Sequence, residues 1–281
     1  MTDEVIALRP RMMSVAYRML GSVADAEDAV QDAFMRFHTA GGVSSPEGFL
    51  IRTTTRLCID RLRERKRREY VGPWVPEPLE TRSAAKGAAL AESLSQAFLL
   101  LLERLTPDER AAFLLRTVFD YEYAEIGGLL DKSESAVRQL MSRARGRLGL
   151  DGERRFQAPA ARADAMAERF VVACRAGDIK AVEAMLAEDA ELHPDGGGKA
   201  SAARVVIRGP YKVARFLVGV FRKSWMQDFG VATVNGEPGL VFRIGDVVAA
   251  VLSVRVEDKV RAVYITVNPD KLVRWSTAEI E

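Results

Sequence analysis

The stretch from Leu105 to Leu148 restricts the fold of this chain more than any other. It reads LTPDERAAFLLRTVFDYEYAEIGGLLDKSESAVRQLMSRARGRL. Thr106, Pro107 and Glu109 predict a helix start, because an N-cap hydroxyl, a proline in the first helical position and a carboxylate three residues after the cap suit the unpaired N–H groups there. We expect this helix to reach about Phe119.

Two more helices joined by a tight turn are predicted to follow. They span about Tyr123 to Leu130 and about Glu134 to Leu148, with the turn at Asp131 to Ser133, which is the spacing of a helix-turn-helix. In the longer helix, apolar residues recur every three or four positions. They predict one buried stripe, formed by Val137, Leu140, Met141, Ala144 and Leu148.

The other side of the longer helix carries side chains that can contact DNA. They are Ser135, Arg138, Gln139, Ser142 and Arg143, with Arg145 and Arg147 on the flanks. Short polar, arginine and glutamine side chains near the start of such a helix reach base edges in a major groove, and the later arginines are placed for phosphates. The alternative is a solvated basic face on an ordinary bundle helix.

Length and composition limit the class of protein. A chain of 281 residues can form two or three domains with buried cores. No apolar run approaches the roughly 20 residues that span a bilayer, and the start MTDEVIALRPRM lacks a secretory signal, so we expect a cytoplasmic protein with no membrane partner. The chain has only two cysteines, Cys58 and Cys174, and two histidines, so we expect neither a disulfide framework nor a metal or cofactor.

The first 70 residues predict helices of opposite charge. Helices at 4–20 and 23–37 meet at Gly21, and the carboxylates of the second suit its N-terminal dipole or a protein partner. A loop at 38–46 follows. The next helix has a net charge of +6, because only Asp60 and Glu64 oppose eight basic residues, which favours polyanion contact over a solvated helix end. The eight are Arg52, Arg56, Arg61, Arg63, Arg65, Lys66, Arg67 and Arg68. The net charge of the whole chain is only +2, so nucleic-acid affinity must come from such local clusters.

Four segments in this order resemble the second and fourth domains of an extracytoplasmic-function sigma factor. They are AEDAVQDAF, LIRTTTRLCIDRLRERKRR, LTPDERAAFLL and YAEIGGLLDKSESAVRQLMSRARGRL. The resemblance covers about residues 5–148. It implies two all-α domains, at 1–70 and 91–150, that bind promoter DNA and the RNA polymerase core, at the clamp helices of the largest catalytic subunit and at the flap.

The resemblance also implies roles for single residues. Asp28, Gln31, Asp32 and Phe34 would bind the polymerase core. The loop around Val43 would capture a flipped base of the minus-ten element, next to Arg52, Arg56, Arg61 and Arg63. The minus-thirty-five element would be read by Ser135, Arg138, Gln139, Ser142, Arg143 and Arg145.

Two departures from the family pattern involve three residues. Arg56 stands where the family often has asparagine. Asp131 and Lys132 stand in the turn, where glycine followed by an apolar residue is common. Aspartate tolerates a left-handed backbone, so the turn can form, but Lys132 must extend its amine towards solvent.

Residues 71–90 are predicted to form a linker. Pro73, Pro76 and Pro78 favour an extended backbone without helix, and Trp74 offers one large apolar anchor. A passive spacer needs no tryptophan. We therefore expect the linker to dock on another part of the protein.

The last part, about residues 160–281, predicts an α+β domain. Helices are expected at 161–177, 178–189 and 212–224, with a turn at 193–200. Four strand-like runs at 231–236, 239–245, 246–258 and 259–268 then predict an antiparallel sheet. The order resembles a SnoaL-like, cystatin-type cone, in which helices close one side of a curved sheet.

Three motifs resemble the sigma-factor subgroup that carries such a domain at its C-terminus. They are WVPEP at Trp74, DGGGK at Asp195 and NPDKL at Asn268. In that subgroup the fused domain takes the place of a separate anti-sigma factor, which implies regulatory contacts for Trp74, Pro76, Asp195, Gly196, Gly197, Gly198, Lys199, Asn268, Pro269, Asp270 and Lys271. Three glycines let another backbone approach closely, and we expect Asp195 and Lys199 to bracket that opening with opposite charges.

Alternatives remain at this stage. A helix-turn-helix regulator could bind duplex DNA without polymerase. A SnoaL-type enzyme fused to DNA-binding helices could use His193, Asp195 or Asp228 as acid or base, and the cone could hold a small-molecule ligand. The leading interpretation is a sigma factor that is not an enzyme and has no catalytic residues.

Overall fold

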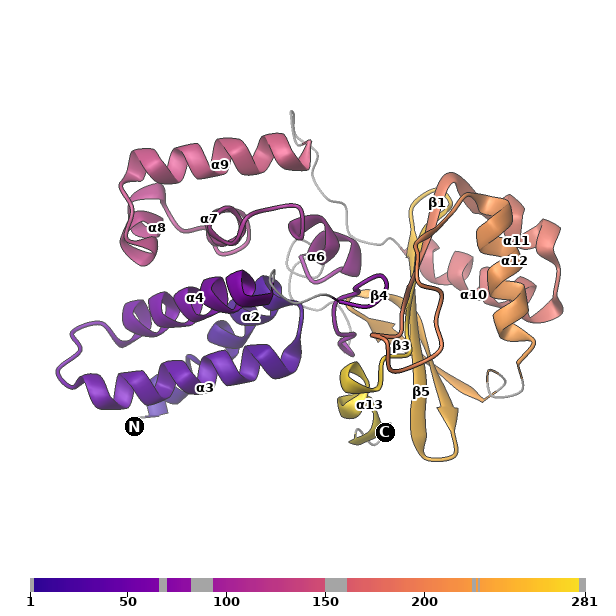
Figure 1. Cartoon of the computed structure of the whole chain (residues 1–281), viewed down its shortest axis with the longest axis horizontal. Coiled ribbons are helices and arrows are strands. Elements are labelled where there is room, and N and C mark those ends of the chain that lie inside the picture. The colour runs from indigo at the N-terminus through magenta and orange to yellow at the C-terminus, as the bar shows by residue number, and fades with distance from the viewer. Residues whose placement is uncertain are drawn as a thin grey trace. The chain divides into compact units, whose positions relative to one another are not determined.

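The chain forms two compact units. The computed structural model describes residues 3–65, 70–81, 93–149, 161–223, 226 and 228–277. Contacts group Met1–Glu69 with Phe98–Arg155, and Tyr70–Ala97 with Phe156–Glu281 (Figure 1). The first unit is helical and the second combines helices with a sheet, which confirms the predicted fold class. The described part of the linker lies in the second unit, and Lys66, Arg67 and Arg68 of the predicted basic run lie outside the described residues.

The helices of the first unit are α1 Asp3–Ile6, α2 Arg9–Leu20, α3 Val23–Ala40, α4 Pro46–Arg65, α7 Pro107–Thr117, α8 Tyr123–Leu130 and α9 Glu134–Leu148. Helix α6, Gln96–Leu102, begins in the second unit and ends in the first. The single helix predicted over residues 4–20 is wrong, because the chain breaks between α1 and α2. Pro10 explains the break, since it lacks an N–H group and its ring would clash with the carbonyl four residues earlier in a continuous helix.

The helix-turn-helix forms as its local signals predict. Thr106 and Glu109 make a reciprocal capping box on α7, and Ser133 caps α9 by accepting a hydrogen bond from the Ala136 N–H. Asp131 adopts the left-handed conformation, with φ 59° and ψ 46°. The predicted stripe on α9 is buried: Val137, Leu140, Met141, Ala144 and Leu148.

The second unit contains a six-stranded sheet in the order β2-β1-β6-β5-β4-β3. Its strands are β1 Leu186–Asp195, β2 Ile207–Arg208, β3 Phe229–Val234, β4 Glu237–Ile244, β5 Val247–Val256 and β6 Val260–Thr266. Its helices are α10 Ala161–Ala176, α11 Ile179–Met185, α12 Pro210–Phe221 and α13 Val273–Thr277, with a 3₁₀ turn, η2, at Pro269–Lys271.

Strand β1 corrects two expectations. Residues 186–195 were expected to end a helix and enter a turn, but they form a strand parallel to β6, so the sheet is mixed and not antiparallel. Ala190 and Leu192 point into the core, while Glu191 and His193 alternate with them on the other face. Only one face of β1 is apolar, so its polar residues led to the prediction of a helix end and a turn instead of a strand.

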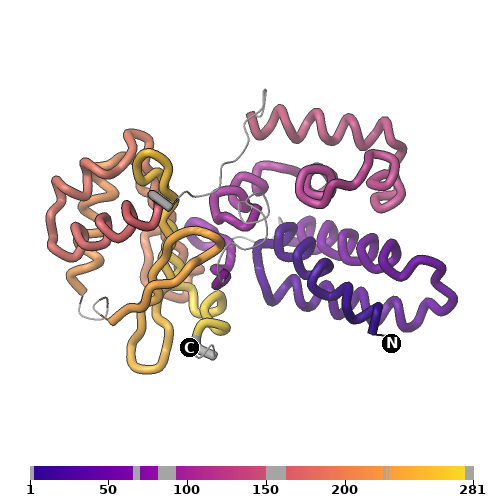
Figure 2. The backbone as a smooth tube through the Cα atoms, turned by 180° about the vertical axis from the view of Figure 1, so that it is seen from behind, coloured from indigo at the N-terminus to yellow at the C-terminus, as the bar shows by residue number. Residues whose placement is uncertain are grey.

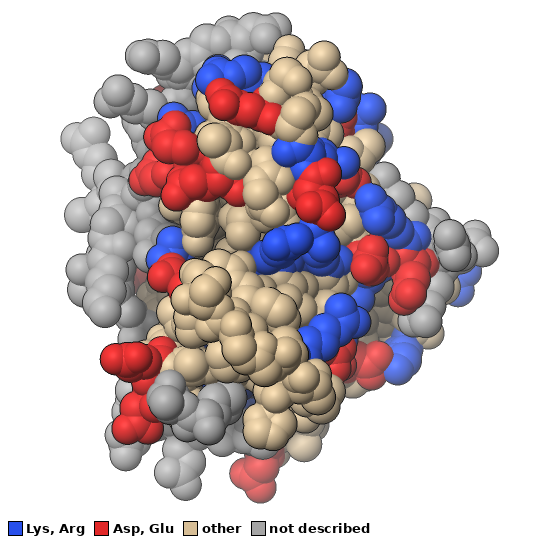
Figure 3. Space-filling model, turned by 90° about the vertical axis from the view of Figure 1, so that its left-hand side faces the viewer, with Lys and Arg blue, Asp and Glu red and all other residues tan. Residues whose placement is uncertain are grey.

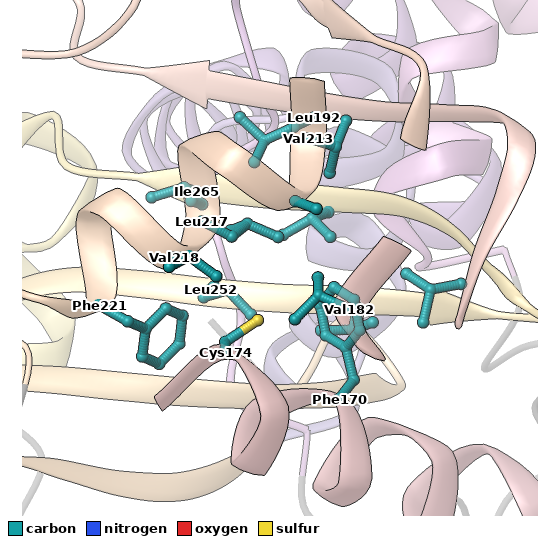
Figure 4. Close-up of a cluster of buried hydrophobic side chains, with 14 of the residues drawn as sticks. Phe170, Cys174, Val182, Leu192, Val213, Leu217, Val218, Phe221, Leu252 and Ile265 are labelled. Atoms are coloured by element: carbon teal, nitrogen blue, oxygen red, sulfur yellow. The ribbon is translucent and has the colours of Figure 1, made fainter. Parts of the chain in front are cut away.

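The two faces of the sheet are covered by different segments. Helices α10, α11 and α12 lie on one face, and α13 lies on the other (Figures 1 and 2). On the first face, Phe170 and Cys174 of α10, Val182 of α11 and Leu217 of α12 turn towards Leu252 and Ile265 of the sheet (Figure 4). On the second face, Leu272 and Trp275 pack with valines of β3, β4 and β5. Within the described residues, no helix is long and apolar enough to cross a membrane.

Gly127 and Gly128 provide a matched test of the helix-turn-helix packing. A Cβ at Gly127 would lie 2.7 Å from the Lys132 carbonyl oxygen, whereas a Cβ at Gly128 would meet nothing within 4 Å. We expect Gly127→Ala to lower the free energy of unfolding by about 1–3 kcal/mol, because the turn backbone must move. Gly128→Ala should raise it by up to about 1 kcal/mol, because alanine favours helix. Urea denaturation of both variants measures the difference, and equal effects would contradict this packing.

Candidate nucleic-acid interface and linker contact

Two of the three residues that depart from the family pattern, Arg56 and Asp131, pair with each other. Arg56 Nη2 lies 2.9 Å from an Asp131 carboxylate oxygen, and Arg52 Nη2 lies 3.7 Å from the other oxygen. All three side chains are at least a third exposed, so each pair contributes little stability. Within the first unit, the helix assigned to the minus-ten element is thus held to the turn before α9.

The next arginines of α4 also have acidic partners. Arg61 lies 3.0 Å from Asp32 and 3.9 Å from Asp28, both assigned to polymerase docking. Arg63 lies 2.8 Å from Asp108 at the start of α7. Asp28 and Gln31 are exposed, whereas Asp32, Phe34 and Val43 are partly buried. The structure therefore brings predicted polymerase residues and predicted DNA residues together.

The recognition side of α9 faces solvent. Ser135, Arg138, Gln139, Ser142, Arg143 and Arg145 are all exposed. The guanidinium of Arg138 lies 2.6 Å from Glu134 and stacks over the Tyr123 ring, 4.4 Å from its centroid. These contacts hold Arg138 near the start of the helix, where a side chain can reach base edges.

Glu109 ties α9 to α7. Its buried carboxylate lies 3.4 Å from Arg143 and 3.0 Å from Arg147. Burial alone would raise the pKa of Glu109, but hydrogen bonds from Thr106 and the charges of Arg147 and Arg143 outweigh it and lower the pKa below its ordinary value. Glu109 therefore remains ionised and neutralises part of the basic helix. On the face drawn in Figure 3, basic and acidic groups likewise lie interspersed instead of forming one basic field.

The linker is extended and docks on the second unit, as expected. Residues 75–78 are buried, and Val75 is 0% exposed. Trp74, which was expected to offer one large apolar anchor, is partly buried. The backbone N–H and carbonyl of Val75 are both hydrogen-bonded, to Asp195 and Lys271, so Val75 is one attachment point of the linker.

Four side chains form what we call the acid–lysine cluster: Tyr70, Asp195, Asn268 and Lys271. The Asp195 carboxylate accepts hydrogen bonds from the Tyr70 hydroxyl at 2.6 Å, from the Val75 N–H at 2.9 Å and from Lys271 Nζ at 2.6 Å. Lys271 Nζ also donates to the Val75 carbonyl at 2.5 Å. The side chains of Asp195 and Lys271 are 0% and 10% exposed. The linker backbone thus completes a buried ion pair.

Aromatic rings complete the surroundings of Lys271. Its ammonium lies 5.0 Å from the centroid of Tyr70 and 4.7 Å from that of Trp74, within the range of cation–π attraction. Asn268 Nδ2 donates to the Tyr70 hydroxyl at 3.0 Å. Trp74 therefore serves here as a partner for a cation.

Other segments approach Gly197 and Gly198 of the glycine turn closely, but with side chains and not with the backbone that the sequence predicted. Gly197 and Gly198 have φ of 57° and 74°, and a Cβ at Gly198 would lie 3.1 Å from the Val71 Cβ. A Cβ at Gly197 would lie 2.2 Å from Asn268 Nδ2. Asp195 and Lys199, expected to bracket this opening, have different partners: Lys199 binds the exposed Asp270 at 2.5 Å, and Asp195 binds Lys271.

Several residues of the linker contact were not predicted. Asn235, Gln96 and Trp275 bind the linker, and Tyr70 binds Asp195; for example, Trp275 Nε1 donates to the Pro78 carbonyl at 2.9 Å. Two features of the sequence could have indicated them: Tyr70 directly precedes the linker, and Asn235 forms an Asn-Gly turn pair with Gly236. Their partners lie more than 100 positions away, beyond any local pattern.

Two of the three groups considered for catalysis, Asp195 and His193, are engaged elsewhere. Asp195 has both oxygens bound, and His193 Nε2 lies 3.0 Å from Glu191. Burial lowers the pKa of His193, although Glu191 opposes the effect. Among the described residues, no group of three or more histidine, cysteine or acidic side chains is placed to hold a metal ion.

Glu237, at the start of β4, is a buried acid on the linker side of the sheet. It is 3% exposed, and its Oε1 lies 3.8 Å from Arg255 while its Oε2 makes no hydrogen bond to the described residues. Burial raises the pKa of Glu237 to about 7, although Arg255 opposes this.

Comparisons with known proteins match both units. The family model described as Sigma-70 region 2 matches residues 5–68, and the one described as Sigma-70, region 4 matches residues 95–148. The ECF RNA polymerase sigma factor SigJ of Mycobacterium tuberculosis is 36% identical, over 96% of this chain and 92% of that protein. The probable ECF RNA polymerase sigma factor SigI of the same species is 29% identical, over 95% and 92%. The crystal structure of M. tuberculosis SigJ matches with a TM-score of 0.77 and 35% identity, over 94% of this chain and 95% of that one.

Glu237→Gln tests the buried acid. In the unfolded wild type, Glu237 loses its proton near pH 4.5, whereas in the folded state it keeps the proton up to about pH 7. The free energy of unfolding of the wild type therefore falls as pH rises from about 4.5 to about 7. Glutamine has no such penalty. We expect the variant to gain up to about 3 kcal/mol over the wild type between pH 4.5 and pH 8, measured by urea unfolding. The exposed Glu188→Gln is the control, and a stability difference that does not change with pH would refute the assignment.

Proposed function

This chain belongs to the extracytoplasmic-function family of RNA polymerase sigma factors, and we propose that its second unit regulates initiation by holding the linker between the two sigma motifs. As a sigma factor it interacts with RNA polymerase and promoter DNA. The polymerase core supplies the chemistry, and this chain supplies promoter recognition.

The first unit carries the groups for recognition. We propose that Asp28, Gln31, Asp32 and Phe34 dock on the clamp helices of the largest polymerase subunit, and that α9 reads the minus-thirty-five element. The exposure of the recognition side of α9 supports this assignment. Val43, Arg52, Arg56, Arg61 and Arg63 would bind the opened minus-ten strand. The ion pairs of the four arginines are all at least partly exposed, so phosphates can replace the carboxylates at low cost.

The single observation that carries the regulatory proposal is the dependence of a buried ion pair on the linker. Asp195 ends β1 and Lys271 lies 76 positions later in η2, and the N–H and carbonyl of Val75 complete their hydrogen bonding. A buried pair with missing partners is unfavourable, so the second unit is most stable with the linker bound. Anything that frees the linker must therefore disturb this cluster.

A small-molecule ligand in the cone has less support. Apolar side chains of α10, α11 and α12 fill the space against the sheet (Figure 4). A hollow of about 220 Å³ lies instead beside the linker, between Val71 and Gly72 and the glycine turn. The proposal therefore assigns regulation to the linker contact and does not require a ligand.

Substitutions on α9 test base reading against phosphate contact. Arg138→Ala and Gln139→Ala should weaken binding to a subset of upstream sequences by about 1–3 kcal/mol, because they remove contacts to base edges. Arg145→Ala should weaken all sequences alike, because phosphates are common to every promoter. Binding of holoenzyme to a panel of promoters measures both, and equal losses on every promoter for all three variants would reject the assignment.

Two lysine variants of the full chain test the regulatory proposal. Lys271→Met leaves Asp195 buried without its cation and should free the linker. Run-off transcription with purified core should then change in the same direction as for a chain cut near Gln157, a position outside the described residues, while core binding persists. Lys199→Met is the control, because its pair with Asp270 is more than half exposed. If the cut chain and Lys271→Met both transcribe like the wild type, the regulatory role is absent, and if no form directs initiation, the chain acts without polymerase.

A further inference from the structure

The turn between β3 and β4 makes contacts that its own geometry does not require. Asn235 and Gly236 have φ of 53° and 77°, as in the two-residue hairpin turns for which Asn-Gly is favoured. An asparagine chosen only for that backbone would leave its side chain in solvent. Asn235 is instead 0% exposed.

The Asn235 amide joins two parts of the chain. Its Oδ1 accepts a hydrogen bond from the Leu79 N–H at 2.9 Å, and its Nδ2 donates to the Leu94 carbonyl at 2.8 Å. The Asn235 N–H donates to the Leu79 carbonyl at 2.8 Å. Leu79 and Leu94 lie before and after residues 82–92, so one side chain holds both described ends of that segment.

The linker also pairs with the sheet next to this turn. Strand β3 is the last strand of the sheet, and Glu80 bridges Val234 in antiparallel fashion. The Thr81 N–H donates to the Thr233 carbonyl at 2.9 Å, and the Gly236 N–H donates to Thr81 Oγ1 at 2.9 Å. Addition of an extended segment to a sheet edge is a common way for a domain to bind a peptide.

We propose that this set of bonds, the Asn235 contact, is a second attachment site for the linker, independent of the acid–lysine cluster. The Asn235 contact consists of neutral hydrogen bonds at the end of an edge strand, whereas the acid–lysine cluster is a buried ion pair. Each neutral bond contributes little net stability, so residues 79–81 can detach while Val75 stays bound. The effect on transcription rests on the proposed regulatory function, but the attachment is a property of the free chain.

Asn235→Gly in the full chain tests the proposal. Glycine keeps the positive φ of the turn and removes only the amide. Asp246→Gly is the matched control. Both variants create a Gly-Gly pair in a hairpin turn, but Asp246, in the β4–β5 turn, is exposed. Hydrogen exchange, read residue by residue, should be about tenfold faster at the Leu79 and Thr81 amides of the first variant. The Val75 amide, bound to Asp195, should exchange as in the wild type, and the control should change none of the three.

Thr81→Val provides a second variant on the linker itself, which leaves the turn sequence intact. It should speed exchange at the Gly236 amide, whose acceptor it removes. Unchanged exchange at Leu79 and Thr81 in Asn235→Gly would overturn the attachment, and equal acceleration at Val75 would overturn its independence. Faster exchange at Leu79 and Thr81 together with wild-type transcription by the Lys271→Met and cut chains would leave the attachment in place and reject only the regulatory function.

Discussion

The buried pair of Asp195 and Lys271 is the interaction on which the second unit depends. Two charges removed from water are costly unless their remaining hydrogen-bonding capacity is used. Tyr70 and both backbone groups of Val75 supply that capacity here, and all of them come from the segment that joins the two sigma motifs. The stability of the second unit therefore depends on the position of the linker.

In contrast to the buried pair of the second unit, most ion pairs of the first unit are exposed. Its arginines pair with carboxylates at the surface, where water and salt weaken the attraction. Such pairs limit non-specific attraction of polyanions yet can exchange a carboxylate for a phosphate. Glu109 is one exception, because it is buried and remains ionised beside Arg143 and Arg147. It therefore gives α9 a permanent acidic partner.

The linker contact differs from an ordinary interdomain surface because backbone groups carry much of it. Val75, Leu79 and Thr81 all bind through N–H or carbonyl groups, which any extended segment offers. Specificity comes from the prolines that keep the chain extended and from the glycines that let Val71 approach. A mixture of one strong ionic site and weaker main-chain pairing allows partial release of the linker.

Local signals in the sequence determined the helix-turn-helix, since the caps at Thr106 and Ser133 and the apolar stripe of α9 act within a few residues. They also determined that the linker is extended and that the glycine turn is open. Only the tertiary structure decided that β1 pairs in parallel with β6, that Lys271 and not Lys199 neutralises Asp195, and that Asn235 binds the linker. These choices join residues far apart in the chain, and local periodicity, which shows which face of an element is buried, does not show which distant segment covers it.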